Sequence, residues 1–284
     1  LGNVTDRNAD TFGYIARSEV TSADIGSTIS RYAYDNIGNN LWVSVNAATN
    51  FYSANALNQY TAIDTTTLAY DADGNLLTNG DWSYTWDAEN RLVATYSNNV
   101  CVVSNAYDHA SRRVLKITPT ATHTYVYDGW NLVQETISTA FGTTTNHYVW
   151  GKDLSGTMQG AGGVGGLLAV SLNSTWYFPF YDNNGNVLAY VNEQGAIAAE
   201  YTYDAFGRTI AQSGIMADAF AFRFSTKYYD AEIGLYYYGY RFHSPELMRW
   251  LNRDPTGERG GLPLYGFCGN DPVNKWDYLG KETI

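Results

Sequence analysis

The sequence predicts an all-β protein in which antiparallel strand–turn–strand repeats assemble into one long sheet. Three observations support this: a high aromatic content, a recurring Tyr-Asp or Trp-Asp pair, and a glycine that follows many of these pairs at a fixed distance. Aromatic residues make up 15% of the 284 residues and include 25 tyrosines. Because such side chains suit pleated, half-buried surfaces, the composition favours strands over helices.

The repeat is visible in the spacing of the aromatic-aspartate pairs. Most successive pairs fit a unit of about 20 residues, a period typical of stacked structural repeats. The longest step contains a glycine-rich insertion, residues 151–166. The pairs begin at Tyr34, Tyr70, Trp86, Tyr107, Tyr127, Tyr181, Tyr203 and Tyr229.

Each unit has the chemistry of a strand, a turn and a return strand. Tyr201 and Tyr203 alternate along the chain, so both rings point to one face of a strand. Asp204 then opens a turn by accepting hydrogen bonds from backbone amides two residues on. Gly207, three residues after the aspartate, supplies the positive φ that closes a type I turn with a bulge. Stacked units of this kind predict a long antiparallel sheet.

Composition and charge argue against several classes of partner. A formal net charge of −11 would repel nucleic acid and anionic membrane surfaces. No apolar run approaches the length of a membrane span, and the first residues lack the features of a signal peptide. An export signal therefore lies upstream, or the protein stays inside the cell. Cys101 and Cys268 match no metal or redox spacing; we expect buried free thiols, with a disulfide as the alternative.

Several motifs resemble ligand sites without meeting their requirements. Residues 160–165 match a dinucleotide fingerprint, but the run that follows them is short and β-like, which favours a flexible loop. Residues 71–75 and 182–186 resemble the start of a calcium loop, yet the glycine is misplaced, which favours turn aspartates. The four histidines show no ligand spacing. The sequence therefore predicts no cofactor and no metal site.

One short helix is predicted near the C-terminal end. Ser244 is a suitable N-cap, Pro245 suits the first helical position, and Glu246 complements the positive helix end. The helix would run to Leu251 and form a structural corner.

The repeats resemble the YD repeats of Rhs proteins, of Tc toxin C-type subunits and of teneurins, and the resemblance spans Leu1 to Gly280. Residues 127–135 are similar to a recurrent Rhs unit. The Rhs-associated core module is the most specific part of the resemblance, carried by residues 234–246, 253–255, 261–267, 270–274 and 277–280.

The resemblance implies a hollow β-shell that a C-terminal core module plugs. It implies a YD-repeat array over 1–200, an Rhs core module over 201–280 and a tail remnant at 281–284. We expect a structural encapsulation or scaffold role within a polymorphic toxin or secreted surface protein, at a bacterial surface or secreted. The implied partners are upstream YD repeats and a C-terminal effector segment. The chain is expected to start within a repeat, and its last four residues are too few for an effector.

The family also implies one catalytic hypothesis, aspartyl autoproteolysis that releases an effector. Two close carboxylates share one proton, one activating water and the other protonating the leaving group. The resemblance assigns these roles to Asp254 and Asp277, with Asp271 as the next choice. Arg253 would hold one carboxylate ionised or polarise the scissile carbonyl. Tyr278 and Lys281 depart from the family's cleavage motif, which has a proline and an apolar residue there. The alternative is that both aspartates only form turns.

The last hypothesis is binding rather than catalysis. Exposed tyrosines on a β-surface stack on sugars or on proteins of a cell surface, which would make this an adhesion module. The alternative is that the rings pack on their neighbours within the sheet.

Overall fold

The structure, a computed structural model, describes residues 2–284. Its dominant feature is one 21-stranded sheet in which each strand pairs antiparallel with the strands before and after it. The predicted all-β repeat sheet is confirmed. The first half comprises β1 (Asp6–Arg7), β2 (Asp10–Tyr14), β3 (Val20–Ile25), β4 (Thr28–Tyr34), β5 (Asn40–Val45), β6 (Ala48–Ala54), β7 (Tyr60–Ile63), β8 (Thr66–Tyr70), β9 (Leu76–Asn79) and β10 (Trp82–Trp86).

The second half of the sheet has longer strands and contains the insertion. Residues 151–166 form an irregular loop between β16 and β17, as predicted for the glycine-rich segment, and the pairing of β16 with β17 continues across it. The strands are β11 (Leu92–Ser97), β12 (Val100–Tyr107), β13 (Arg113–Ile117), β14 (Ala121–Asp128), β15 (Asn131–Thr139), β16 (Gly142–Trp150), β17 (Leu167–Leu172), β18 (Thr175–Tyr181), β19 (Val187–Asn192), β20 (Ile197–Tyr203) and β21 (Thr209–Ser213).

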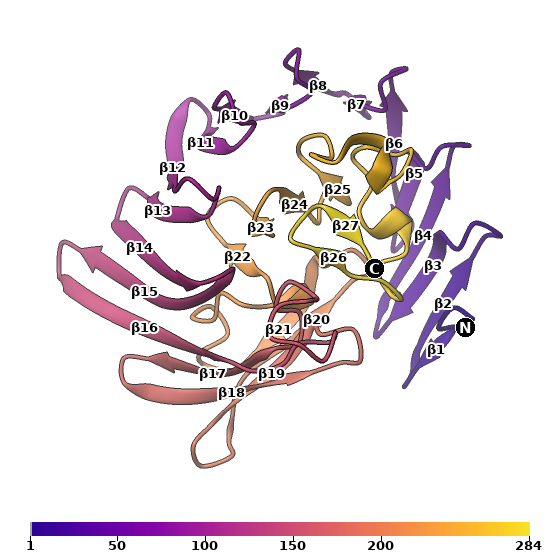
Figure 1. Ribbon diagram of the computed structural model, residues 1–284. Helices are drawn as coiled ribbons and strands as arrows, with labels where there is room; N and C mark the ends of the chain where they lie inside the picture. Colours follow the sequence, from indigo (N-terminus) through magenta and orange to yellow (C-terminus); the bar gives the residue numbers. More distant parts are fainter. Residues whose placement is uncertain (1) are drawn as a thin grey trace.

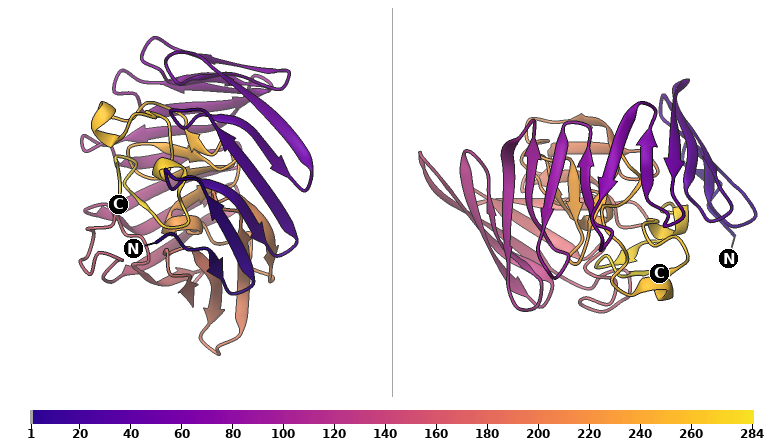
Figure 2. Two further views of the ribbon diagram at one scale, coloured as in Figure 1. Left: turned by 90° about the vertical axis from the view of Figure 1, so that its right-hand side faces the viewer. Right: turned by 90° about the horizontal axis from the view of Figure 1, so that it is seen from above.

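The sheet curves around the C-terminal part of the chain (Figure 1). Because of this curvature, the first strands contact the later repeats. Arg7 forms an ion pair with Asp182 at 2.6 Å, and the rings of Tyr32 and Phe206 lie 5.3 Å apart. Seen from above, the strands stand around the C-terminal segment as a wall (Figure 2). We call the 21-stranded sheet the wall and residues 214–284 the plug.

The aromatic residue of most pairs donates a side-chain hydrogen bond to a backbone carbonyl of the preceding repeat, a contact that we call the tyrosine latch. Tyr203 donates its hydroxyl hydrogen to the carbonyl oxygen of Val187 at 2.7 Å, and Tyr107 does the same to Leu92 at 2.7 Å. Trp86 replaces tyrosine in this role because its indole N–H donates to Leu76 at 2.8 Å. The same bond recurs at Tyr34, Tyr127 and Tyr181, and Trp150 makes it too although no aspartate follows it.

In most pairs the aspartate organises the turn as predicted. Asp204 Oδ1 accepts the N–H groups of Phe206 and Arg208, both at 2.9 Å, and Gly207 has φ +91°. The register shifts between Thr202 and Tyr203, which is the predicted bulge. The residue four positions after the aspartate, which was not predicted to take part, also contributes: an arginine or asparagine side chain there bonds the second carboxylate oxygen.

The plug contains a four-stranded sheet, a two-stranded hairpin and three short 3₁₀ turns. The strands are β22 (Tyr228–Asp230), β23 (Leu235–Tyr237), β24 (Phe242–Ser244), β25 (Arg249–Trp250), β26 (Asp277–Tyr278) and β27 (Glu282–Thr283), and the turns are η1 (Phe224–Thr226), η2 (Gly257–Gly260) and η3 (Cys268–Asn270). None of the helical segments within 2–284 is long and apolar enough to cross a membrane.

The predicted helix from Ser244 is wrong, because residues 245–248 form a tight turn that joins β24 to β25. Ser244 does cap the N–H of Leu247 with its hydroxyl at 3.1 Å. Met248, however, has φ +57°, a left-handed conformation that ends a helix and returns the chain as a strand. Capping chemistry alone does not distinguish these outcomes.

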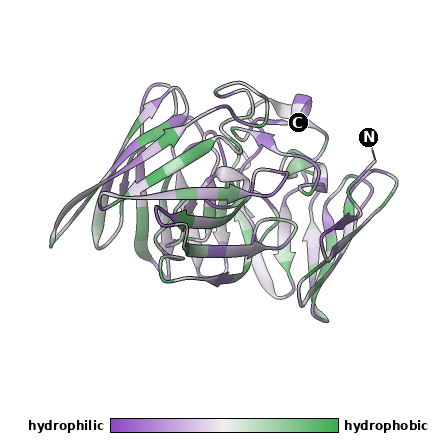
Figure 3. Cartoon of the chain, turned by 90° about the horizontal axis from the view of Figure 1, so that it is seen from below, coloured by the Kyte–Doolittle hydropathy of each residue, from purple (hydrophilic) through white to green (hydrophobic). Residues whose placement is uncertain are grey.

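The aromatic side chains mostly face inward. The tyrosines of the wall pack against rings of the plug, including Tyr190 stacked on Phe220 at 3.8 Å and Tyr148 against Phe222 at 5.0 Å. This favours the packing interpretation of the tyrosines. Apolar residues also recur along the strands (Figure 3), where Phe178 and Phe180 are exposed. Both cysteines are free thiols; Cys268 is buried as predicted, but Cys101 is exposed, because it lies near the solvent-facing end of β12.

Buried charges join the plug to the wall. Arg113 on β13 pairs with Asp230 on β22 at 2.6 Å, and Lys116 contacts the other oxygen of Asp230 at 3.0 Å. Glu135 on β15 accepts hydrogen bonds from Tyr148 at 2.7 Å and from Tyr228 of the plug at 2.6 Å. Since isolated buried charges are costly, displacing the plug would leave these groups without their partners at a cost in free energy.

Candidate functional site

The structure brings the two predicted carboxylates together around one arginine that the sequence argument did not single out. Arg241, which precedes β24, contacts Asp254 at 2.7 Å and Asp277 at 3.8 Å through the same nitrogen, Nη2. All three side chains are almost fully buried. Asp254 follows β25 and Asp277 begins β26, so the plug's sheet and its terminal hairpin build the site jointly.

Asp277 is the more perturbed of the two acids. Its burial raises the pKa to about 6, against the opposing pull of the Arg241 cation and of the N–H groups of Lys281 and Gly280, while the charge of Asp254 raises it further. Asp254 is held differently: one oxygen bonds Arg241, and the other accepts the N–H and the hydroxyl hydrogen of Thr256 at 2.7 and 2.6 Å. Two acids in unlike environments are the arrangement that acid–base chemistry requires.

The peptide bond at the predicted cut lies within this arrangement. The carbonyl oxygen of Gly280 accepts a hydrogen bond from Arg241 Nε at 2.5 Å. The N–H of Lys281, on the other side of the same peptide bond, donates to Asp277 Oδ1 at 2.9 Å. Both ends of the Gly280–Lys281 peptide group are therefore bound by the groups that surround the two aspartates.

Arg253 lies apart from this contact. It is exposed, and its side chain packs beside Gly74 and Tyr265. Together with Asp254 and Tyr240 it lines a cavity of about 370 Å³ that opens next to the site. Asp271 is buried, bonds Asn274 at 2.5 Å and lies 3.9 Å from Lys275.

Arg241 carried a signal in the sequence. It interrupts an aromatic run that extends from Tyr236 to Phe242, and a charge within such a run indicates a buried, paired side chain. Lys227 is a second buried cation near the site. Burial lowers its pKa to about 8, against the charges of Asp277 and Asp153, and its ammonium donates to the carbonyl oxygen of Gly162 at 2.6 Å. The glycine-rich insertion thus reaches the plug.

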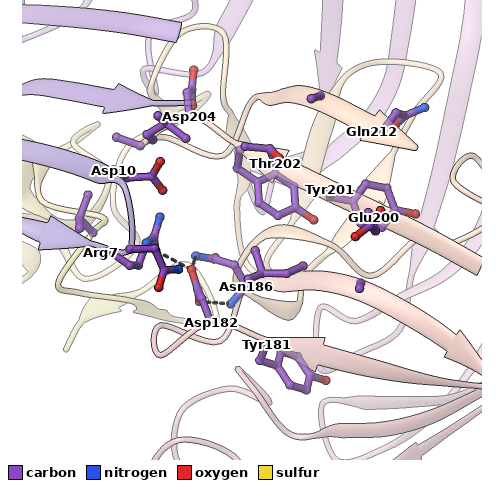
Figure 4. A pocket seen from close by; sticks show the side chains of 18 of the residues that line it. Arg7, Asp10, Tyr181, Asp182, Asn186, Glu200, Tyr201, Thr202, Asp204 and Gln212 are labelled. Atoms are coloured by element: carbon purple, nitrogen blue, oxygen red, sulfur yellow. Dashed lines mark hydrogen bonds and ion pairs between the residues drawn. The ribbon is translucent and has the colours of Figure 1, made fainter. Parts of the chain in front are cut away.

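A cavity of about 650 Å³ lies between the first strands and the later repeats (Figure 4). Its lining mixes apolar side chains with charged ones, which include Arg7, Asp10, Asp182, Glu200 and Asp204. Burial raises the pKa of Asp204 to about 6. The Asp182 turn, considered above as a calcium loop, instead directs its carboxylate to its own backbone and to Arg7.

No cluster of metal-ligating side chains is present among residues 2–284. His123 bonds Glu135 at 2.8 Å, and His243 lies buried among aromatic rings, where burial lowers its pKa to about 3. The loop of residues 160–165 has no helix after it, so the dinucleotide interpretation also fails.

Comparison with known proteins identifies the family to which this architecture belongs. The teneurin YD-shell family model matches residues 3–273. The chain belongs to the teneurin YD-shell family. Among curated relatives of this YD shell, the tRNA3(Ser)-specific nuclease WapA of Bacillus spizizenii is 30% identical over 88% of the chain, and the double-stranded DNA deaminase toxin A of Burkholderia cenocepacia is 28% identical over 76%.

A solved structure has the same fold. The Tc holotoxin pore of Photorhabdus luminescens matches 95% of the YD shell with a TM-score of 0.78 and 22% identity, over 15% of its own chain. The YD shell spans 11% of the WapA relative and 17% of the deaminase toxin. The resemblance to Rhs and Tc proteins is therefore confirmed, and the shared part is the shell.

Proposed function

We propose that this chain is a section of shell wall with its closing plug, and that in the whole protein it encloses a C-terminal effector segment. The observation that carries the proposal is the plug's docking inside the wall through the buried Arg113–Asp230 pair and the Glu135–Tyr228 bond. Upstream YD repeats are the proposed neighbours of β1, which within residues 2–284 pairs only with β2. The proposed division remains a repeat array over 1–200 and a core module over 201–280, whose first residues, 201–213, complete the wall within β20 and β21.

The relatives support a carrier role rather than a shared enzyme activity. One is named a tRNA nuclease and another a DNA deaminase, two unlike reactions, yet both match the same shell region. A region common to both is suited to holding an activity that lies elsewhere in each chain. We accordingly propose a secreted or cell-surface setting for this protein.

Protease protection tests the encapsulation. A protease-sensitive segment placed after Ile284, in a protein that also carries upstream repeats, should be cut at least about tenfold more slowly than the same segment alone, because a folded shell excludes the protease. Protection should vanish in denaturant. Equal cutting rates with the shell folded would reject the proposal.

The second candidate function is self-cleavage of the Gly280–Lys281 bond, favoured by the paired contacts to that peptide group. In the proposed reaction the Asp254 carboxylate takes a proton from water, and the resulting hydroxide attacks the carbonyl carbon of Gly280. Arg241 stabilises the negative charge that develops on the carbonyl oxygen. Protonated Asp277 donates its proton to the nitrogen of Lys281 as the C–N bond breaks.

A reporter fused after Ile284 tests the cleavage, because its release is measured directly by mass spectrometry. The released fragment should begin at Lys281, which shows cleavage between Gly280 and Lys281. Its release should be lost in Asp254→Asn and in Asp277→Asn. Asp64→Asn is the control, since Asp64 accepts the N–H of Phe51 in the turn between β7 and β8 and does not line the cavity beside the site. Equal release from all four proteins would show contaminating protease, and no release would leave both aspartates as turn residues.

A further inference from the structure

Lys281 departs from the apolar residue of the resembled cleavage motif, and the structure shows where its side chain lies. Its ammonium nitrogen lies 3.5 Å from the centre of the Tyr240 ring. No carboxylate within residues 2–284 lies at ion-pair distance from Lys281. The aromatic face is therefore the group that holds the cation, through the attraction of a positive charge to the ring's negative face.

A second aromatic ring supports Tyr240. Trp130, in the turn between β14 and β15 of the wall, lies 4.7 Å from the Tyr240 ring centre. Gly239 permits this approach: it has φ +119°, and a Cβ there would lie 3.1 Å from the Trp130 ring. The glycine-rich insertion in turn fixes the Trp130 turn, because Gln159 accepts the N–H of Trp130 at 2.9 Å and donates to the carbonyl oxygen of Asp128 at 2.8 Å.

The neighbouring backbone sets the register of this contact. The N–H of Tyr240 donates to the carbonyl oxygen of Leu279 at 3.0 Å. The next residue, Arg241, bonds the carbonyl oxygen of Gly280 at 2.5 Å. Consecutive residues of the plug thus contact consecutive residues of the cleavage segment, and the side chain of residue 281 is directed onto the Tyr240 ring.

We propose that Tyr240, supported by Trp130, is a subsite for the side chain that follows the Gly280–Lys281 bond, and that it favours a cation there. The proposal deepens the proposed self-cleavage and rests on it for its role in selecting the cut. The contact itself is independent of cleavage. The wall, the insertion and the plug all contribute residues to the subsite. The contact of the Lys281 side chain with Tyr240 therefore requires that the plug is docked against the wall.

A double-mutant cycle tests the subsite without requiring cleavage. Lys281→Met keeps the length of the side chain and removes its charge. Hydrogen exchange of residues 276–284 should become about threefold to tenfold faster in Lys281→Met, the range expected for a lost cation–π contact. The same change made in Tyr240→Leu should have little further effect, and Tyr240→Phe should behave like the parent protein. Lys275→Met is the control cation.

The same proteins carrying the reporter fusion give the second measurement. Release should fall about threefold to tenfold on Lys281→Met in the parent and remain unchanged by it in Tyr240→Leu. If Lys281→Met acts equally in both backgrounds in the exchange measurement, the subsite is overturned. If the exchange cycle holds but no fusion releases its reporter, the subsite stands and the proposed cleavage is rejected.

Discussion

Arg241 donates through Nε to the carbonyl oxygen of Gly280 at 2.5 Å while its Nη2 contacts the carboxylates of Asp254 and Asp277. A single guanidinium therefore connects the candidate acids with the peptide bond on which they would act. Its rigid fork of donors makes this possible, since a lysine ammonium presents one charged point rather than a planar set of N–H groups. The site accordingly depends on the exact position of one buried side chain in the plug.

Stability should depend on pH through Asp277. Its pKa is about 6 in the folded protein, above the usual value of about 3.9, so the folded state holds this proton more tightly than the unfolded state. Its contribution is most favourable below about pH 4 and is lost as the pH rises through 6, by about 3 kcal/mol in total. Urea unfolding at pH 4.5 and 7.5 should show this decline in the parent and a smaller one in Asp277→Asn. Parallel curves would contradict the burial of a charged Asp277.

The tyrosine latch should contribute to the stability of the wall. Tyr203→Phe removes the hydroxyl that donates to Val187 and leaves a buried carbonyl oxygen without this partner, which should cost about 1–2 kcal/mol. Tyr52→Phe is the matched control, because Tyr52 is buried at 8% exposure but its hydroxyl makes no hydrogen bond within residues 2–284. Equal unfolding free energies for the two variants would show that the latch contributes nothing.

Alanine substitutions at two glycines should distinguish the cost of backbone strain from the cost of overpacking. Gly195 has φ +77° with open space around it, so Gly195→Ala should cost about 1 kcal/mol from the left-handed backbone alone. Gly207 has φ +91°, and a Cβ there would lie 2.6 Å from the ring of Phe224 in the plug. Gly207→Ala should therefore cost about 1–3 kcal/mol more, from overpacking. A thermal or urea melt that ranks the two variants equally would indicate that Phe224 does not press on this turn.

The buried ion pair between wall and plug should be the most sensitive position. Arg113→Met leaves Asp230 with only Lys116 as a charged partner in a site that excludes water, and should cost about 3–5 kcal/mol. Arg31→Met is the control, because its pair with Asp24 is exposed and should change stability by less than about 1 kcal/mol. Limited proteolysis of Arg113→Met should cut first within the plug. A cost comparable with that of Arg31→Met would contradict the buried docking.

The repeated local chemistry explains why so much of the wall was predictable. Tyrosine, aspartate and glycine at fixed spacing determine strand, turn and bulge without reference to distant residues, as at Tyr203, Asp204 and Gly207. The pairing of Asp254 with Asp277 was expected only from the family resemblance. Arg241 and Tyr240 were missed because their partners, Gly280 and Lys281, lie about 40 residues away along the chain, and no local period connects them.

The failed helix prediction has a similar cause. Ser244, Pro245 and Glu246 satisfy the local rules for a helix start, and the Ser244 hydroxyl does cap a backbone N–H. Whether the chain continues as a helix depends on what its next turn would contact. Here the pairing of His243 with Trp250 and of Ser244 with Arg249 returns the chain as a hairpin. Tertiary pairing overrides local propensity at this position.

Thiol labelling measures whether the wall and its plug enclose the segment that follows them. A cysteine placed in a segment after Ile284, in a protein with upstream repeats, is compared with Cys101, which is exposed on β12, and with buried Cys268. If the segment is enclosed, the added cysteine should react with a maleimide at least about tenfold more slowly than Cys101 while the shell is folded, and equally fast in denaturant. Reaction as fast as that of Cys101 in the folded protein would contradict enclosure.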